Sequence, residues 1–191
     1  YSVPILRECL TNKDSRIRSR AIETLGKIAN TEIAQKNGIE RDVSSLDDLI
    51  AAYDRERDPR MKETVVNALL NFRDMSPEKH AGIVRTLQKA INHTDKPLRS
   101  TGAAVLLRIS PKDGIPEVID KIADSTYFGQ EQNSILGVLK EETGQDFGAA
   151  GPSRPEGTTS VKQGWTLPAL IGGVAVGIGI LAIVLLLRKR L

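Results

Sequence analysis

The stretch from Asp14 to Ile28, DSRIRSRAIETLGKI, decides the fold, because segments of the same pattern return twice. The copies are DPRMKETVVNALLNF at 58–72 and DKPLRSTGAAVLLRI at 95–109. In each copy an Asp stands first, a basic residue stands four places on, and apolar or small residues follow three and four apart. This spacing predicts one amphipathic helix, capped by its Asp, that occurs three times in the chain.

Each of these helices follows another stretch with apolar residues at helical spacing. The preceding stretches are 3–10, a segment that Ser45 can cap, and a segment opened by Ser76-Pro77-Glu78. A looser fourth pair lies at 115–122 and 135–139, without the Asp and basic signature. The polar segment 30–43 is a loop or contains a short extra turn. The pattern predicts an all-α protein, an α-solenoid of about four helical hairpins in which the last unit serves as a cap.

The three copies share the pattern D-x-x-[ILVM]-[RK]-x-x-[AVG], which begins at Asp14, Asp58 and Asp95. With it the chain resembles the HEAT-repeat family, and more narrowly the short bacterial-type HEAT-like repeats, over about residues 1–148. The resemblance implies a right-handed superhelix of helix pairs that serves mainly as a protein-binding scaffold.

The distribution of charge along the chain and the low aromatic content both argue against nucleic-acid binding. Residues 1–148 hold 22 basic and 23 acidic residues, a net charge of −1, whereas residues 149–191 carry +4. Only 4% of the residues are aromatic, which is low for a surface that stacks on bases. The folded part therefore lacks the basic surface that nucleic acid needs.

The N-terminal region holds the single cysteine and an incomplete apolar helix face. Cys9 has apolar neighbours, so a buried and inert thiol is favoured over a reactive one. The sequence starts at Tyr1, and apolar residues at helical spacing begin within its first few residues. We therefore expect that a leader or an upstream segment was removed, and the sequence leaves open which of the two it was.

The C-terminal region changes composition. Residues 149–164 are rich in Gly, Pro, Ser and Thr and predict a flexible linker. From Leu167 to Leu187 the chain has 21 consecutive residues without a charge, enough to span about 30 Å of hydrocarbon. We therefore predict four parts: a repeat domain at 1–148, the linker, a transmembrane helix at 165–187, and a short basic cytoplasmic tail at 188–191.

The residues that flank the predicted span indicate its orientation. Trp165 precedes it as an interfacial anchor, and Arg188, Lys189 and Arg190 follow it. The positive-inside rule then favours a cytoplasmic C-terminus and a periplasmic or lumenal repeat domain. The alternative is a tail-anchored protein whose repeat domain lies in the cytosol. Within the span, Ala169, Gly173 and Gly177 form a stripe of small residues against which another helix can pack.

No catalytic, cofactor or metal motif stands out in the sequence. His80 and His93 have no ligand partner at metal spacing and are interpreted as surface histidines. The Asp and basic pairs, such as Asp14 with Arg18, are interpreted as caps and as contacts between neighbouring repeats rather than as ligand sites. We therefore predict no catalytic residue, no metal and no cofactor.

Partner contacts are predicted on the solvent side of the repeated helices. Lys27, Asn71 and Arg108 fall in register there and are expected to line one groove of the superhelix. The function that the sequence favours is a non-catalytic, single-pass, membrane-anchored scaffold for other proteins, as an accessory subunit of a larger membrane complex. The alternatives are a tail-anchored cytosolic adaptor, or an enzyme subunit whose solenoid binds a small ligand or cofactor.

Overall fold

The computed structural model describes residues 2–122, 124, 126–145 and 147. Within these residues the chain forms helices and no strand, so the predicted all-α class is confirmed. The α-helices are α1 (Val3–Cys9), α2 (Ser15–Ala29), α3 (Thr31–Lys36), α4 (Leu46–Arg55), α5 (Pro59–Leu69), α6 (Pro77–Ile91), α7 (Lys96–Ile109), α8 (Pro111–Ile122) and α9 (Gln132–Thr143). Two short 3-10 helices, η1 (Leu70–Phe72) and η2 (Gly129–Glu131), complete the set in the described residues.

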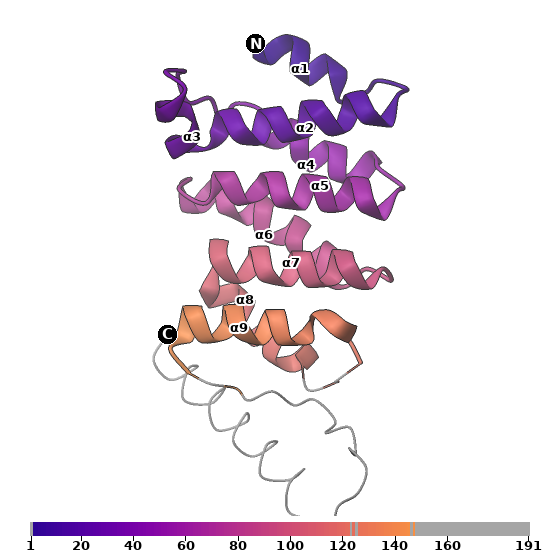
Figure 1. The fold of residues 1–191 in the computed structure, drawn as a ribbon, viewed down its shortest axis with the longest axis vertical. Helices are drawn as coiled ribbons and strands as arrows, with labels where there is room; N and C mark the ends of the chain where they lie inside the picture. Colours follow the sequence, from indigo (N-terminus) through magenta and orange to yellow (C-terminus); the bar gives the residue numbers. More distant parts are fainter. Residues whose placement is uncertain (1, 123, 125, 146, 148–191) are drawn as a thin grey trace, which may run out of the picture.

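The helices lie in two layers (Figure 1). In one layer α2, α5, α7 and α9 lie side by side in chain order, and each contacts the next. The second layer holds α1, α4, α6 and α8, and each of these contacts the helix that follows it in the first layer. The beginning and the end of the described chain therefore lie at opposite ends of the stack.

The core lies between the two layers, where equivalent residues of the repeated helices meet. Leu25, Leu69 and Leu106 stand at the same distance from their capping Asp, and all three are buried. Leu139 of α9 and Phe128 of the preceding turn are also fully buried, so the looser fourth pair joins the same core. The spacing of apolar residues three and four apart thus produces one continuous core rather than four separate ones.

The polar connection after α2 contains an additional helix. Asn30 ends α2, and its side-chain Oδ1 accepts a hydrogen bond from the Ile33 N–H (2.9 Å), which caps the start of α3. Of the two predicted alternatives for this segment, the short extra turn is therefore correct. After α3 the chain turns at Gly38, whose positive φ of 61° suits a residue without a side chain.

Two local predictions are wrong. Ser45 occupies the N-cap position of α4, but its side chain makes no capping hydrogen bond, because its backbone (φ −86°, ψ 3°) is not extended as a cap requires. Ile17 is the first apolar residue of the predicted spacing in the copy at 14–28, which favours burial, yet it is 42% exposed. The preceding helix α1 is only seven residues long and contains no buried residue, whereas Ala21, one turn after Ile17, is buried.

The predicted linker at 149–164, the transmembrane helix at 165–187 and the tail at 188–191 lie outside the described residues. Among the helices that are described, none combines the length and the apolar character that crossing a membrane requires.

Candidate functional site

The predicted capping of the repeated helices is confirmed at all three copies. The Asp14 and Asp58 carboxylates each accept a hydrogen bond from the N–H two residues on, at 2.8 Å and 2.9 Å. Asp95 accepts from the Leu98 N–H at 3.0 Å. These bonds satisfy backbone donors that have no partner within the helix, so each Asp determines where its helix begins.

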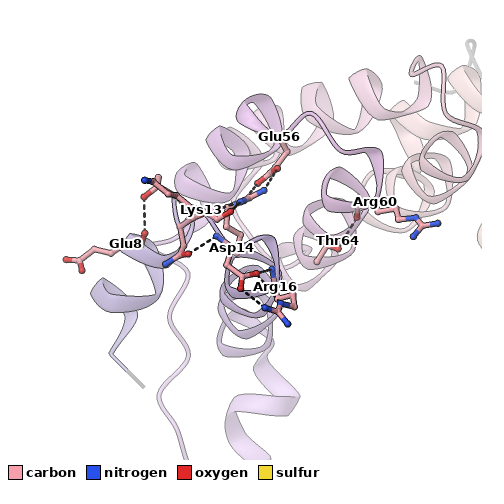
Figure 2. A network of polar contacts seen from close by, with 10 residues as sticks. Glu8, Lys13, Asp14, Arg16, Glu56, Arg60 and Thr64 are labelled. Carbon is pink, nitrogen blue, oxygen red and sulfur yellow. Dashed lines mark hydrogen bonds and ion pairs between the residues drawn. The ribbon is translucent and has the colours of Figure 1, made fainter.

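In the first copy the basic residue connects two hairpins. Arg18 donates from Nε to Glu56 Oε1 (2.6 Å) and from Nη2 to Glu56 Oε2 (3.1 Å). Its third nitrogen, Nη1, donates to the carbonyls of Asn12 (2.8 Å) and Lys13 (3.2 Å). The turn between α1 and α2 is thereby joined to the turn between α4 and α5, where Glu56 lies (Figure 2). The ion pair is largely shielded from solvent, because the Glu56 side chain is only 10% exposed.

Arg99 makes the equivalent connection in the third copy. Its Nη1 donates to the carbonyls of His93 (3.1 Å) and Thr94 (3.3 Å), which match Asn12 and Lys13 in register. Its Nη2 donates to the carbonyl of Tyr127, and the guanidinium lies 4.5 Å from the centre of the Tyr127 ring. The third hairpin is thus joined to the turn before α9.

The second copy differs because its basic residue is a lysine. Lys62 Nζ lies 4.3 Å above the ring centre of Tyr53 in the same hairpin. Burial raises the pKa of Tyr53 to about 12, so its phenol stays neutral at physiological pH. The prediction that the basic residue reaches a neighbouring repeat therefore holds for the two arginines and is wrong for Lys62. An ammonium group cannot bridge a carboxylate and two carbonyls in one plane as a guanidinium does.

The charged groups around the first turn hold one another in their ionised forms. Hydrogen bonds from the Arg16 side chain and then from its backbone N–H lower the pKa of Asp14. The hydrogen bond to Glu56 raises the pKa of Arg18 above its usual value. Figure 2 shows Asp14 beside Arg16 at the start of α2, with Glu56 on the adjacent turn. The lowered pKa of Asp14 and the raised pKa of Arg18 keep both groups ionised at neutral pH, which suits them to a structural connection between turns.

The two histidines are used in local backbone contacts. His93 Nδ1 accepts a hydrogen bond from the Asp95 N–H (3.0 Å), in the position where Asn12 accepts from Asp14. His80 Nε2 lies 2.8 Å from the Arg73 carbonyl. The described residues contain no group of three or more His, Cys, Asp or Glu side chains placed to hold a metal ion.

The three predicted partner-contact residues are not brought together in one hollow. Arg108 lies at the edge of a hollow of about 340 Å³ across α5, α7 and α9, which Glu63 and Thr101 also line. Asn71 lines a second hollow, and its Oδ1 accepts a hydrogen bond from Asn30 Nδ2 (2.8 Å) that connects the ends of two hairpins. Lys27 is exposed on α2 and lines neither of these hollows.

The hollow beside Arg108 is polar and is crossed by contacts between neighbouring helices. Thr101 donates to Glu63 (2.8 Å) between α7 and α5, and Arg108 Nη2 lies 3.8 Å from Glu141 Oε2 of α9. A hollow of this kind can present both hydrogen-bond donors and hydrogen-bond acceptors to the surface of another protein. The predicted contact residues of the span and its flanks, from Trp165 to Arg190, lie outside the described residues.

A larger hollow of about 680 Å³ lies between the start of α1 and the connection before α4. Val3, Ile39, Val43 and Lys79 are among the residues that line it. Arg41, also on its wall, already donates from Nε to the Ala29 carbonyl (2.7 Å). The lining combines apolar residues such as Ile28 and Val43 with charged residues such as Asp42.

Sequence reasoning missed the partners of the two arginines and the Asn30–Asn71 bond. Glu56 is 38 residues from Arg18 in the chain, and Asn30 is 41 residues from Asn71. The signal in the sequence was the equivalent position of the basic residue, four places after the capping Asp, which reaches the turn of the next hairpin in the two copies with arginine. A comparison of the chain with models of protein families, with characterised proteins and with solved structures finds no match.

Proposed function

We propose that this chain is a non-catalytic, membrane-anchored scaffold that binds other proteins, as an accessory subunit of a larger membrane complex. In this proposal residues 1–148 form an α-solenoid of about four HEAT-like hairpins. One observation carries it. The helices of the first layer, α2, α5, α7 and α9, which we call the outer helices, each contact the next one in chain order, and Arg18 and Arg99 make matching connections between turns. Packing of neighbour on neighbour is the principle of a solenoid, which exposes long surfaces for partners.

The anchor in this proposal is the apolar segment at 165–187. Its length, Trp165 before it and the basic residues at 188–190 after it support a single-pass helix with a cytoplasmic C-terminus. The repeat domain then lies in the periplasm or an equivalent lumen, joined to the membrane by the linker at 149–164. The small-residue stripe of Ala169, Gly173 and Gly177 supplies a surface for membrane-embedded subunits.

Partner contact is proposed on the outer helix layer. Lys27 and Arg108 are exposed there, on α2 and α7. Asn71 is half-buried and engaged with Asn30, so its contribution to a partner contact is the smallest of the three.

Co-purification tests the proposal. The full chain, tagged at its N-terminus, is solubilised from its own membranes in a mild detergent, and we expect other proteins to elute with it in fixed ratio. Charge reversal of both Lys27 and Arg108 to Glu should reduce this yield, since the contact would lose two cations. Lys79→Glu, on the other layer, is the matched control. Elution of the chain without any other protein would refute the scaffold role.

The orientation has its own test. Protease is added to intact cells whose outer barrier, where they have one, has been permeabilised. We expect removal of the repeat domain and survival of the C-terminal tail. A domain that resists protease until the cytoplasmic membrane is opened would instead identify a tail-anchored cytosolic adaptor.

A further inference from the structure

A hollow of about 520 Å³ lies between two neighbouring turns of the stack, where α2 and α5 begin. One wall is the turn between α1 and α2, and the other is the turn between α4 and α5, so both walls belong to described residues. Figure 2 shows the two turns, with Lys13 on one and Glu56 on the other. We call this space the turn hollow, and its charged lining residues are Lys13, Arg18, Arg55, Glu56, Arg57 and Asp58.

The turn hollow is a local concentration of positive charge. Four of its charged residues are basic and two are acidic, which gives a net charge of +2. The repeat region 1–148 as a whole has a net charge of −1. A hollow lined mainly by charges of one sign raises the local concentration of oppositely charged groups. The turn hollow is therefore suited to an anion, although the region around it is not basic.

The two acidic residues of the turn hollow are already engaged within the chain. Both carboxylate oxygens of Glu56 accept hydrogen bonds from Arg18, at 2.6 Å and 3.1 Å. Asp58 Oδ1 accepts a hydrogen bond from the Arg60 N–H (2.9 Å) and caps α5. Arg18 is thereby neutralised by Glu56, and of the four carboxylate oxygens only Asp58 Oδ2 makes no hydrogen bond within the described residues.

The three remaining cations have no such partner. Lys13, Arg55 and Arg57 are exposed, and their side chains make no hydrogen bond or ion pair with any described residue. Asn12, also on the wall, accepts a hydrogen bond from the Asp14 N–H through Oδ1 (2.9 Å), which leaves its Nδ2 to donate. The free side-chain groups of the turn hollow are thus mostly hydrogen-bond donors. A ligand that fits them supplies acceptors and negative charge.

Carboxylates suit the turn hollow better than a phosphate group does. A phosphate site brings several fixed donors together on one anion, often at a helix N-terminus. Here the fixed guanidinium of Arg18 already holds a carboxylate in a two-point contact, and Asp14 and Asp58 cap the starts of both helices. The unengaged cations are exposed and are divided between two turns, so they suit several separate acidic groups. A protein segment rich in Asp and Glu offers such groups along its length.

We propose that the turn hollow binds an acidic segment of a partner protein, whose separate carboxylates pair with Lys13, Arg55 and Arg57. This inference rests on the proposed scaffold role, because it takes the partner to be a protein. It adds a contact site on the turns, apart from Lys27 and Arg108 on the outer helices. Because the pairs are exposed, each one is weak, and they act through their number and by speeding association.

Titration of fluorescein-labelled octaglutamate with the full chain in mild detergent, followed by fluorescence anisotropy, tests the proposal. We expect saturable binding that weakens as salt is added, since exposed charges are screened. A triple variant that combines Lys13→Gln, Arg55→Gln and Arg57→Gln should raise the dissociation constant at least about tenfold, because three ion pairs are lost.

The matched control combines Lys36→Gln, Arg85→Gln and Lys112→Gln, which removes the same charge from exposed positions outside the turn hollow. Its dissociation constant should stay close to that of the unaltered protein. Circular dichroism should show equal helix content in all three proteins. No binding by the unaltered protein, or equal losses in the triple variant and the control, would overturn the proposal.

Two further measurements locate the site and identify its ligand class. Carbodiimide coupling of bound octaglutamate, mapped by mass spectrometry, should place the cross-link on Lys13. Cross-links confined to other lysines would contradict the proposal. Inorganic phosphate should compete with octaglutamate no better than chloride does at equal ionic strength. Much stronger competition by phosphate would show that the turn hollow is a phosphate site and would also overturn the proposal.

The titration separates this inference from the proposed scaffold role. Proteins that co-purify with a chain that does not bind octaglutamate would support the scaffold role and refute the turn hollow as an acidic-segment site. Binding of octaglutamate at Lys13 by a chain that elutes without other proteins would support acidic recognition at the turn hollow and refute the scaffold role.

Discussion

At the scale of single residues, the choice between arginine and lysine after the capping Asp determines what the side chain connects. Arg18 and Arg99 each bond two carbonyls of their own turn and one group of the next hairpin. Lys62 makes a cation–π contact within its hairpin instead. The planar guanidinium offers five donors in a fixed arrangement, whereas the ammonium is a compact point charge.

The Arg18–Glu56 pair should therefore contribute to stability more than an exposed ion pair does. We expect Arg18→Gln or Glu56→Gln to lower the free energy of unfolding by roughly 2 kcal/mol, since each leaves a charged hydrogen-bonding group without its partner. Urea unfolding of the full chain in mild detergent, followed by circular dichroism, measures this. The loss in the double variant should be smaller than the sum of the losses in the two single variants. Arg20→Gln, an exposed residue of the same helix, is the control. Strict additivity of the two single losses would show that the side chains do not interact.

The dependence of stability on pH should reflect Asp14. Hydrogen bonds from Arg16 lower its pKa in the folded protein below the value of about 3.9 of an unfolded chain. Its stabilisation is therefore complete above about pH 4 and is lost as the pH falls through the lower, folded-state pKa. Asp14→Asn keeps an acceptor for the Arg16 N–H but cannot titrate there.

Unfolding midpoints measured from pH 7 down to pH 2.5 test this. The difference between the unaltered protein and Asp14→Asn should be largest at neutral pH and shrink below pH 4. Asp124, whose pKa is lowered by hydrogen bonds from Thr126, should keep both proteins sensitive to acid. A difference that stays constant across the range would mean that the carboxylate charge of Asp14 does not contribute.

At the scale of helices, the spacing between the layers depends on small residues at the crossings. Gly102 of α7 packs directly on α6: a Cβ at this position would lie 2.8 Å from the Ala90 Cβ and 3.1 Å from the Ile91 nitrogen. Gly114 makes a similarly close approach of α8 to the backbone of α7. A side chain at either position would push the layers apart, because protein interiors are close-packed.

Two glycine substitutions should therefore have opposite effects. Gly102→Ala gains helix propensity but introduces a clash with backbone atoms, and we expect a net loss of about 1–3 kcal/mol in the free energy of unfolding. Gly137→Ala in α9 has no atom within 4 Å of its new Cβ, and we expect a gain of up to about 1 kcal/mol. Thermal and urea unfolding measure both. Equal gains for both variants would show that α6 and α7 can separate without cost.

At the scale of the whole molecule, each helix contacts helices that are near it in the sequence. The most embedded helix is α7, which packs on α5, α6, α8 and α9. In contrast, α1 has no buried residue and packs mainly on α2. Local openings at one end therefore cost fewer contacts than openings in the middle.

Hydrogen exchange followed by mass spectrometry should show this gradient. Peptides from α7 should exchange most slowly and those from α1 fastest, because the free energy of local opening follows the number of packed neighbours. Uniform protection from α1 to α9 would indicate a single cooperative unit and contradict the gradient.

The helices, their caps and most of the core could be predicted from the sequence, since these depend on residues within one or two turns of each other. Asp14, Asp58 and Asp95 cap as expected, and Leu25, Leu69 and Leu106 are buried as their spacing predicts. Ser45 does not cap through its side chain, because its backbone does not have the extended conformation that a cap requires. The prediction that one groove contains Lys27, Asn71 and Arg108 was based on identical copies. The copies differ, because α3 follows the first copy and η1 follows α5.

The sequence by itself thus determined the class of the fold, the start of each repeated helix and the residues that face the core, because local periodicity and capping chemistry suffice for these. Only the tertiary structure decided which side chains meet across 38 or more residues, such as Arg18 with Glu56 or Asn30 with Asn71. It alone revealed that Ile17 stays exposed while Met61 and Leu98 are covered. These three apolar residues stand at the same position in their copies but differ in exposure. The physical reason is that burial depends on packing against other helices, and no local pattern contains that information.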